Sequence, residues 1–153
     1  MRHALALTLF LLATFVAAGV GAFFVPGAWY ESLAKPDWNP PNWLFGPVWT
    51  LLYVMIGTSG WLVWREAGFA GARWALSIFA LQIALNAAWS WLFFGLQRPD
   101  LALVEIVVLL LSIALMIGLF WPVSRLAALL LVPYLGWVGF ATVLNAAIWK
   151  LNS

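Results

Sequence analysis

The sequence contains no cysteine, a single histidine and few charged residues. Without cysteine it has no disulfide bond, no thiolate zinc site and no iron–sulfur cluster. The one histidine is His3, so no histidine lies further along the chain to bind a metal ion or a haem iron. Charged residues make up 8% of the chain, against roughly a quarter in soluble domains. These shortages argue against a soluble globular enzyme, a nucleic-acid-binding module and a metal centre.

Apolar residues are abundant instead: they form 66% of the 153 positions and give a mean hydropathy of +1.03. Five segments are each long enough to cross the ~30 Å hydrocarbon core as a helix, and among them only the fourth contains a charge, Glu105. The segments are 4–25, 47–64, 74–96, 101–121 and 126–149. We therefore predict an all-α bundle of five transmembrane helices, formed by one domain over residues 1–153 of an integral multi-pass membrane protein.

The first segment also has features of a signal peptide, because Arg2 and His3 precede it and small residues at 20–22 offer a cleavage site. Its apolar run exceeds the usual length of about 7–15 residues, so we interpret it as a retained helix. The connections 97–100 and 122–125 are short, which predicts that the last three helices are antiparallel neighbours.

Two connections differ in character. Residues 65–73 are predicted to be a short polar loop. Residues 26–46 are long and rich in proline and tryptophan. A connection of this length is typical of a lid or binding element, but its aromatic side chains equally suit a belt at the depth of the lipid headgroups.

Several polar side chains fall inside the predicted spans. Gln82 and Asn86 lie four residues apart on one helical face, and Asn145 lies in the last span. Such groups either hydrogen-bond between helices, typically for about 1 kcal/mol or less, or mark a functional site. Glu105 lies about 6 Å into its span at 1.5 Å per residue, so its carboxylate could also reach the membrane surface.

The twelve tryptophans exceed what two interfacial belts need. Trp49 and Tyr53 are one turn apart, and Tyr134 and Trp137 are three residues apart. Such rings could fill the core or face lipid, or they could stack on a flat ligand that an indole N–H orients. No nucleophile–base pair, carboxylate pair or phosphate-binding glycine loop indicates conventional catalysis.

Four stretches of the sequence form a specific combination. They read KPDWNPP at 35–41, GPVWTLLY at 46–53, VPYLGW at 132–137 and FATVLN at 140–145. The chain thereby resembles, over essentially its whole length, the TspO/MBR family. This family contains tryptophan-rich sensory proteins and the mitochondrial translocator protein formerly called the peripheral benzodiazepine receptor.

The resemblance implies a five-helix receptor or transporter, often dimeric, whose pocket is closed by the first loop. It implies binding of porphyrins such as protoporphyrin IX and of similar flat hydrophobic ligands, with a role in tetrapyrrole transport, disposal or sensing. No cofactor is required, and the porphyrin is the ligand or the substrate. Carried over by motif, the ligand-binding residues are Trp38, Trp49, Tyr53, Asn86, Trp89, Tyr134, Trp137, Ala141, Leu144 and Asn145.

Two alternatives stay open. Some bacterial members degrade protoporphyrin with light and oxygen, which would make Trp49 and Trp137 catalytic here. The chain could also be a structural partner of other membrane proteins without a small ligand. Cholesterol is disfavoured, because the animal motif V-L-N-Y-x-x-W-R reads VLNAAIWK at 143–150 and Ala146 replaces the tyrosine. This departure favours a bacterial membrane.

A stripe of small residues on 74–96 predicts a homodimer, because small residues let transmembrane helices approach closely. The stripe, Ala80, Ala84 and Ala88, lies roughly opposite Gln82 and Asn86 at 100° per residue. A comparable set in the first span, which could instead serve packing within the monomer, is Ala13, Ala17 and Gly21.

Overall fold

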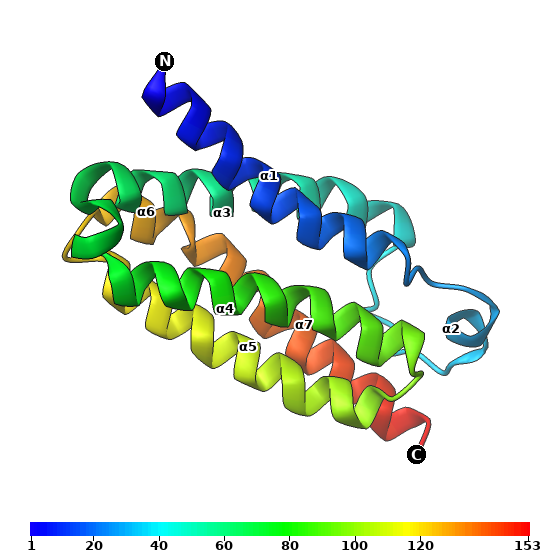
Figure 1. Cartoon of the computed structure of the whole chain (residues 1–153). Helices are drawn as coiled ribbons and strands as arrows, with labels where there is room; N and C mark the ends of the chain where they lie inside the picture. Colours follow the sequence, from blue (N-terminus) through cyan, green and yellow to red (C-terminus); the bar gives the residue numbers. More distant parts are fainter.

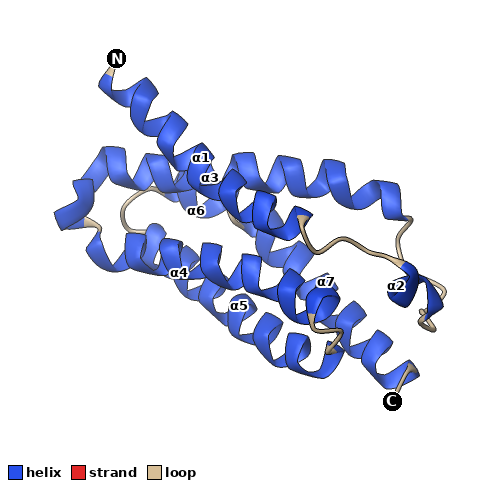
Figure 2. Ribbon diagram, turned by 45° about the vertical axis from the view of Figure 1, so that its right-hand side comes forward, coloured by secondary structure: helices blue, strands red, loops and turns tan.

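The computed structural model describes all residues 1–153 as a bundle of helices without strands (Figure 1), and the same arrangement is seen from a second side in Figure 2. Five helical stretches are long and apolar enough to cross a membrane, which confirms the predicted fold class. They are Arg2–Ala22, Asn42–Gly71, Arg73–Gly95, Pro99–Phe120 and Arg125–Leu151. The two termini lie at opposite ends of the bundle (Figure 1).

The long helices pack in a definite order. Helix α1 (Arg2–Ala22) lies mainly against α3 (Asn42–Gly71) and also contacts α4 (Arg73–Ser90). Helix α5 (Pro99–Phe120) packs between α4 and α7 (Val132–Leu151), which confirms the predicted antiparallel neighbours. Helices α3 and α7, in contrast, touch only sparsely.

Helix α3 extends beyond the predicted span at both ends. It begins at Asn42, directly after Pro41, whose extended backbone (φ −63°, ψ 145°) marks the start. At the other end it continues to Gly71, so the prediction of a polar loop at 65–73 was wrong over most of that stretch. The helix is interrupted only at Gly68 (φ 67°, ψ 179°), in a conformation that glycine adopts readily because it lacks a Cβ atom.

Two further segments differ from the prediction. The connection 26–46 is not all loop, because it contains the short helix α2 (Ala28–Ser32) and the first turn of α3. The last span is two helices, α6 (Arg125–Leu130) and α7, rather than one. Pro133 lies in the first turn of α7, where its missing N–H needs no partner but would have broken a continuous helix. Helix α4 likewise ends in a single π-helical turn, η1 (Trp91–Gly95).

The main core lies where α3 to α7 meet, and a smaller cluster joins α2 and η1 to α5 and α7. The largest fully buried apolar members of the main core are Ile56, Leu109, Ile113, Met116, Phe120, Leu131 and Tyr134. The smaller cluster consists of Tyr30, Phe93, Ala102, Leu144 and Ile148. Many large apolar side chains remain exposed on the outside of the bundle, as a lipid-facing surface requires.

Candidate ligand-binding site

A chain of hydrogen bonds links three helices in the middle of the bundle. The Tyr53 hydroxyl of α3 donates to Asn86 Oδ1 of α4 at 2.8 Å, and Asn86 Nδ2 donates to the Tyr134 hydroxyl of α7 at 2.9 Å. The Tyr134 hydroxyl in turn donates to Gln82 Oε1 at 2.9 Å, and Gln82 Nε2 donates to the Phe79 carbonyl at 3.0 Å. These polar groups therefore satisfy one another, as buried groups in lipid must.

A second junction joins α4, α5 and α7 nearer the C-terminal end. Trp89 Nε1 donates to Asn145 Oδ1 at 3.0 Å, and Asn145 Nδ2 donates to the Pro99 carbonyl at 2.9 Å. The Trp89 ring also stacks on Phe93, with the ring centroids 5.0 Å apart. The polar atoms of Asn86 and Asn145 are thus engaged between helices, which is one of the two interpretations that the sequence left open for such groups.

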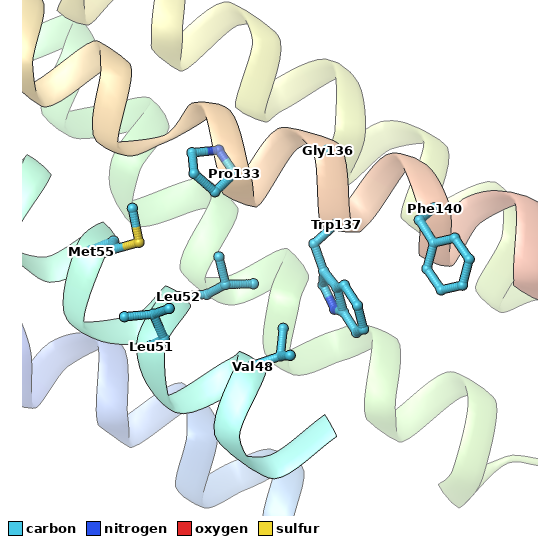
Figure 3. Close-up of a pocket in the computed structure, with 8 residues that line it drawn as sticks. All are labelled: Val48, Leu51, Leu52, Met55, Pro133, Gly136, Trp137 and Phe140. Carbon is cyan, nitrogen blue, oxygen red and sulfur yellow. The ribbon is translucent and has the colours of Figure 1, made fainter. Parts of the chain in front are cut away.

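Between α3 and α7 the bundle opens into a groove with a volume of about 440 Å³ (Figure 3). Its walls are two apolar stripes, each spaced by three or four residues so that it follows one face of a helix. The lining residues are Val48, Leu51, Leu52 and Met55 from α3, and Pro133, Gly136, Trp137 and Phe140 from α7. Most of these residues were missed in the sequence, although the helical spacing on both spans was a signal that could have found them.

The Trp137 indole is the one group in this lining that carries a side-chain nitrogen or oxygen. It extends from α7 toward α3 (Figure 3), with its ring centroid 5.8 Å from that of Phe45 and 5.5 Å from that of Phe140. Its Nε1 atom is buried and has no hydrogen-bond partner. A buried indole N–H usually finds a partner, so one residue of the groove lining carries an unsatisfied donor, whose nitrogen is shielded from solvent.

Two other predicted tryptophans lie close to the groove without lining it. Trp49 is half-buried, with its ring centroid 5.5 Å from Tyr53 and 6.3 Å from Tyr134, beside the hydrogen-bonded chain. Trp38 comes from the connection before α3 and meets Phe140 edge-on at 5.8 Å, while 48% of its surface stays exposed. The structure thus gathers aromatic rings from three segments around the groove.

The remaining predicted residues lie elsewhere on α4 and α7. Leu144 is buried in the smaller core cluster, and Trp89 packs against the same cluster. Ala141 packs against the main core. The structure therefore does not bring all ten predicted residues around one cavity, since Leu144, Asn145 and Trp89 contact α5 or η1 rather than the groove.

The connection before α3 is tied to the end of α7 at the C-terminal end of the bundle. The Ala34 N–H donates to Asn152 Oδ1 at 2.9 Å, and Asn152 Nδ2 donates to the Ala34 carbonyl at 2.9 Å. Lys35 Nζ lies 4.5 Å from the centre of the Tyr30 ring and donates to the Leu33 carbonyl at 3.1 Å. Burial raises the pKa of the Tyr30 phenol, so this anchoring ring stays neutral.

The two small-residue stripes have different surroundings. Ala80 and Ala84 are exposed on the outer side of α4, while Gln82 and Asn86 on the opposite face are buried. In α1, Ala17 is buried, and a Cβ atom added at Gly21 would lie 3.4 Å from the Ser90 hydroxyl oxygen. In α1, Ala17 and Gly21 therefore serve packing within the monomer, whereas Ala13 is exposed; in α4, Ala88 is half-buried.

These features define a class: a polytopic helical membrane protein, held together by hydrogen bonds between its spans and opened on one side by an aromatic groove. Within this class the chain belongs to the TspO/MBR family, which it matches over residues 7–150.

Its relatives come from all three domains of life. The chain is 44% identical over 146 residues to the tryptophan-rich protein TspO of Archaeoglobus fulgidus, a match that covers 94% of each chain. It is 40% identical over 152 residues to the tryptophan-rich sensory protein of Cereibacter sphaeroides, with 99% of this chain and 94% of the relative covered. It is 41% identical over 148 residues to the human translocator protein, with 94% of this chain and 88% of the relative covered.

Proposed function

We propose that this protein binds porphyrin-type tetrapyrroles, such as protoporphyrin IX, and similar flat hydrophobic molecules in the groove between α3 and α7. In this proposal it acts in their transport, disposal or sensing within a bacterial membrane. The observation that carries the proposal is an apolar groove of about 440 Å³, edged by aromatic rings, whose lining holds a single unsatisfied N–H. This volume lies within the range of roughly 300–1,000 Å³ that ligand sites occupy.

The chemistry of the groove favours a macrocycle held by stacking. The rings of Trp137 and Phe140 offer flat apolar faces on which a planar ligand can stack. The names of the relatives, a translocator protein and a sensory protein, are consistent with a binding role.

The test is a titration of purified protein with protoporphyrin IX in the dark, followed by the quenching of tryptophan fluorescence. We expect saturable quenching and a loss of affinity of at most about tenfold, or 1.4 kcal/mol, in Trp137→Phe, which keeps a ring but removes the N–H. Trp74→Phe is the matched control, because Trp74 is exposed at the start of α4. Absence of saturable quenching would refute the proposal and favour a purely structural membrane partner.

Illumination in air separates binding from turnover in the same samples. If Trp49 and Trp137 take part in porphyrin degradation, the porphyrin spectrum should no longer decay under light in their phenylalanine variants. The affinity in the dark should stay within roughly tenfold of wild type. A variant that loses both properties equally would contradict the degradative role and leave a binding protein.

The iron form of the ligand provides a further check. Met55 carries the only sulfur atom in the groove lining, and no histidine or cysteine lies there. We therefore expect metal-free protoporphyrin to bind about as well as haem. A hundredfold preference for haem that disappears in Met55→Leu would show an axial thioether bond instead.

A further inference from the structure

Glu105 of α5 is a half-buried acidic residue that the proposed site does not use. Both of its carboxyl oxygens are shielded from solvent and neither has a hydrogen-bond partner. The residue lies about 9 Å along the axis from Pro99, at 1.5 Å per residue. The sequence left open that this side chain reaches the membrane surface; in the structure its two oxygens are shielded from water, while the residue as a whole is half-buried.

No cation is placed to compensate a charge at this position. The two salt bridges of the chain, Arg65–Glu66 and Arg98–Asp100, lie at helix ends and do not include Glu105. An ionised carboxylate without a partner is costly in a membrane interior, where such groups neutralise instead.

The surroundings of α5 lead to the same conclusion. The elements packed against it are α4, η1, α6 and α7, and their basic residues, Arg73, Arg125 and Lys150, all lie at helix ends. None of these basic residues forms an ion pair or a hydrogen bond with Glu105. Because no cation is available, a bound proton is what neutralises the Glu105 carboxylate.

We propose that Glu105 is a membrane-embedded proton-binding site, whose carboxyl group keeps its proton at neutral pH and is selectively modified by hydrophobic carbodiimides. Carboxyl groups of this kind in transmembrane helices mark proton-handling positions. The proposal is independent of porphyrin binding.

The modification is a balanced addition. The carboxyl proton passes to a carbodiimide nitrogen while the carboxylate oxygen bonds to the central carbon, which gives an O-acylurea. The acyl group then migrates from this oxygen to nitrogen, which gives a stable N-acylurea with no leaving group. Because the protonated acid supplies the proton, labelling should be complete at acidic and neutral pH and should decline only as the pH becomes alkaline.

The experiment treats the full-length protein, reconstituted in lipid vesicles, with dicyclohexylcarbodiimide and locates the adduct by peptide mass spectrometry. We expect one adduct, on the peptide that contains Glu105, and its loss in Glu105→Gln. The matched control is Glu66→Gln, because Glu66 is exposed and its removal should leave the labelling unchanged. A water-soluble carbodiimide with an added amine should show the reverse preference and modify Glu66 but not Glu105.

The proposal is overturned if the hydrophobic reagent leaves Glu105 unmodified in folded wild-type protein, or if the water-soluble reagent modifies Glu105 as fast as Glu66. The adduct is located in the wild-type chain, so the result stands even if Glu105→Gln folds poorly. The variant itself should retain the wild-type unfolding temperature, since an amide replaces a neutral acid of the same shape. A marked fall in that temperature, with Glu66→Gln unchanged, would show that Glu105 is ionised and paired.

Discussion

Helix α3 meets α1 and α7 in opposite ways. Toward α1 it presents Gly57, where an added Cβ atom would lie 2.9 Å from Leu11 Cδ2 and 3.1 Å from Leu11 Cα. At the same contact the Thr14 hydroxyl lies 3.2 Å from the Tyr53 carbonyl and donates to it. Toward α7, α3 presents Val48, Leu51, Leu52 and Met55, and there the helices leave a groove of about 440 Å³.

The contrast shows that two faces of one helix can pack differently in a lipid bilayer. Small residues let the α1 and α3 backbones meet, so van der Waals contacts and a hydrogen bond hold this joint. Between α3 and α7 the helices touch only sparsely, and even Gly136 of α7 faces open space there. Lipid tails are as apolar as the groove walls, so no hydrophobic force closes the gap as it would in water. A membrane helix can therefore pack tightly on one face and leave room for a ligand on another.

The largest effect on stability is expected from a bulky side chain at the close contact between α1 and α3. In Gly57→Leu the new side chain has to displace the backbone of α1, because Leu11 Cα lies in its way. Overpacking of this kind typically costs about 1–3 kcal/mol and sometimes more. We expect a large fall in the unfolding temperature in detergent, whereas Gly118→Leu, at a position with no atom within 4 Å, should change little. Equal behaviour of the two variants would contradict the comparison.

A glycine-to-leucine substitution in the groove should remove ligand binding and leave the fold intact. A Cβ atom added at Gly136 meets no atom within 4 Å, so Gly136→Leu can enter the groove without a clash. We expect the unfolding temperature to stay near that of wild type and the affinity for protoporphyrin to fall more than tenfold. Gly118→Leu is again the control. An unchanged affinity would place the ligand outside this groove.

A smaller loss of stability is expected from breaking the chain of hydrogen bonds that links α3, α4 and α7. Tyr134→Phe keeps the ring but leaves Asn86 Nδ2 and Gln82 Oε1 without this partner. Interhelical hydrogen bonds are worth about 0.6 kcal/mol on average and at most about 1.7, so we expect destabilisation by about 1–2 kcal/mol. Thr58→Val removes only a bond within its own helix and should be nearly silent in the same thermal unfolding measurement.

A local effect is expected where the connection before α3 joins α7. Asn152→Ala removes both hydrogen bonds to the backbone of Ala34. Exposed bonds of this type contribute about 0.5–1.5 kcal/mol each. Hydrogen exchange at the Ala34 amide should accelerate several-fold, while Ser153→Ala, which removes a bond only to Lys150, should leave it unchanged. An unaltered exchange rate at Ala34 would show that other contacts hold the connection.

The smallest effect on stability is expected at the outer stripe of α4, where Ala80 and Ala84 are exposed and Ala88 is half-buried. The homodimer through Ala80, Ala84 and Ala88 stays a prediction. Ala84→Leu should shift purified protein toward monomers in analytical ultracentrifugation and leave porphyrin affinity close to that of wild type. If the variant stays dimeric, or loses ligand binding, the stripe is not the dimer contact.

The groove shows where sequence reasoning reached its limit. The resemblance to the family motifs predicts Trp49, Trp137 and Asn86 as members of one ligand site. In the structure Asn86 is fully engaged with Tyr53 and Tyr134, whereas Trp137 Nε1 is left without a partner. The partner of Asn86 comes from a helix 48 residues away, so no local pattern could distinguish a satisfied group from a free one.

The sequence by itself determined that this protein lies in a lipid bilayer, that it has five spans and that it belongs to its family, because composition and motifs depend only on which residues are present. It also determined that Glu105 would be the one acidic group inside an otherwise uncharged set of predicted spans. The tertiary structure alone decided that α3 continues through 65–67, that the carboxyl oxygens of Glu105 are shielded, and that α3 and α7 stay apart. These outcomes depend on how helices distant in sequence fit against one another. In lipid this fit is set by side-chain shape and hydrogen-bond partners rather than by apolar character, which the spans all share.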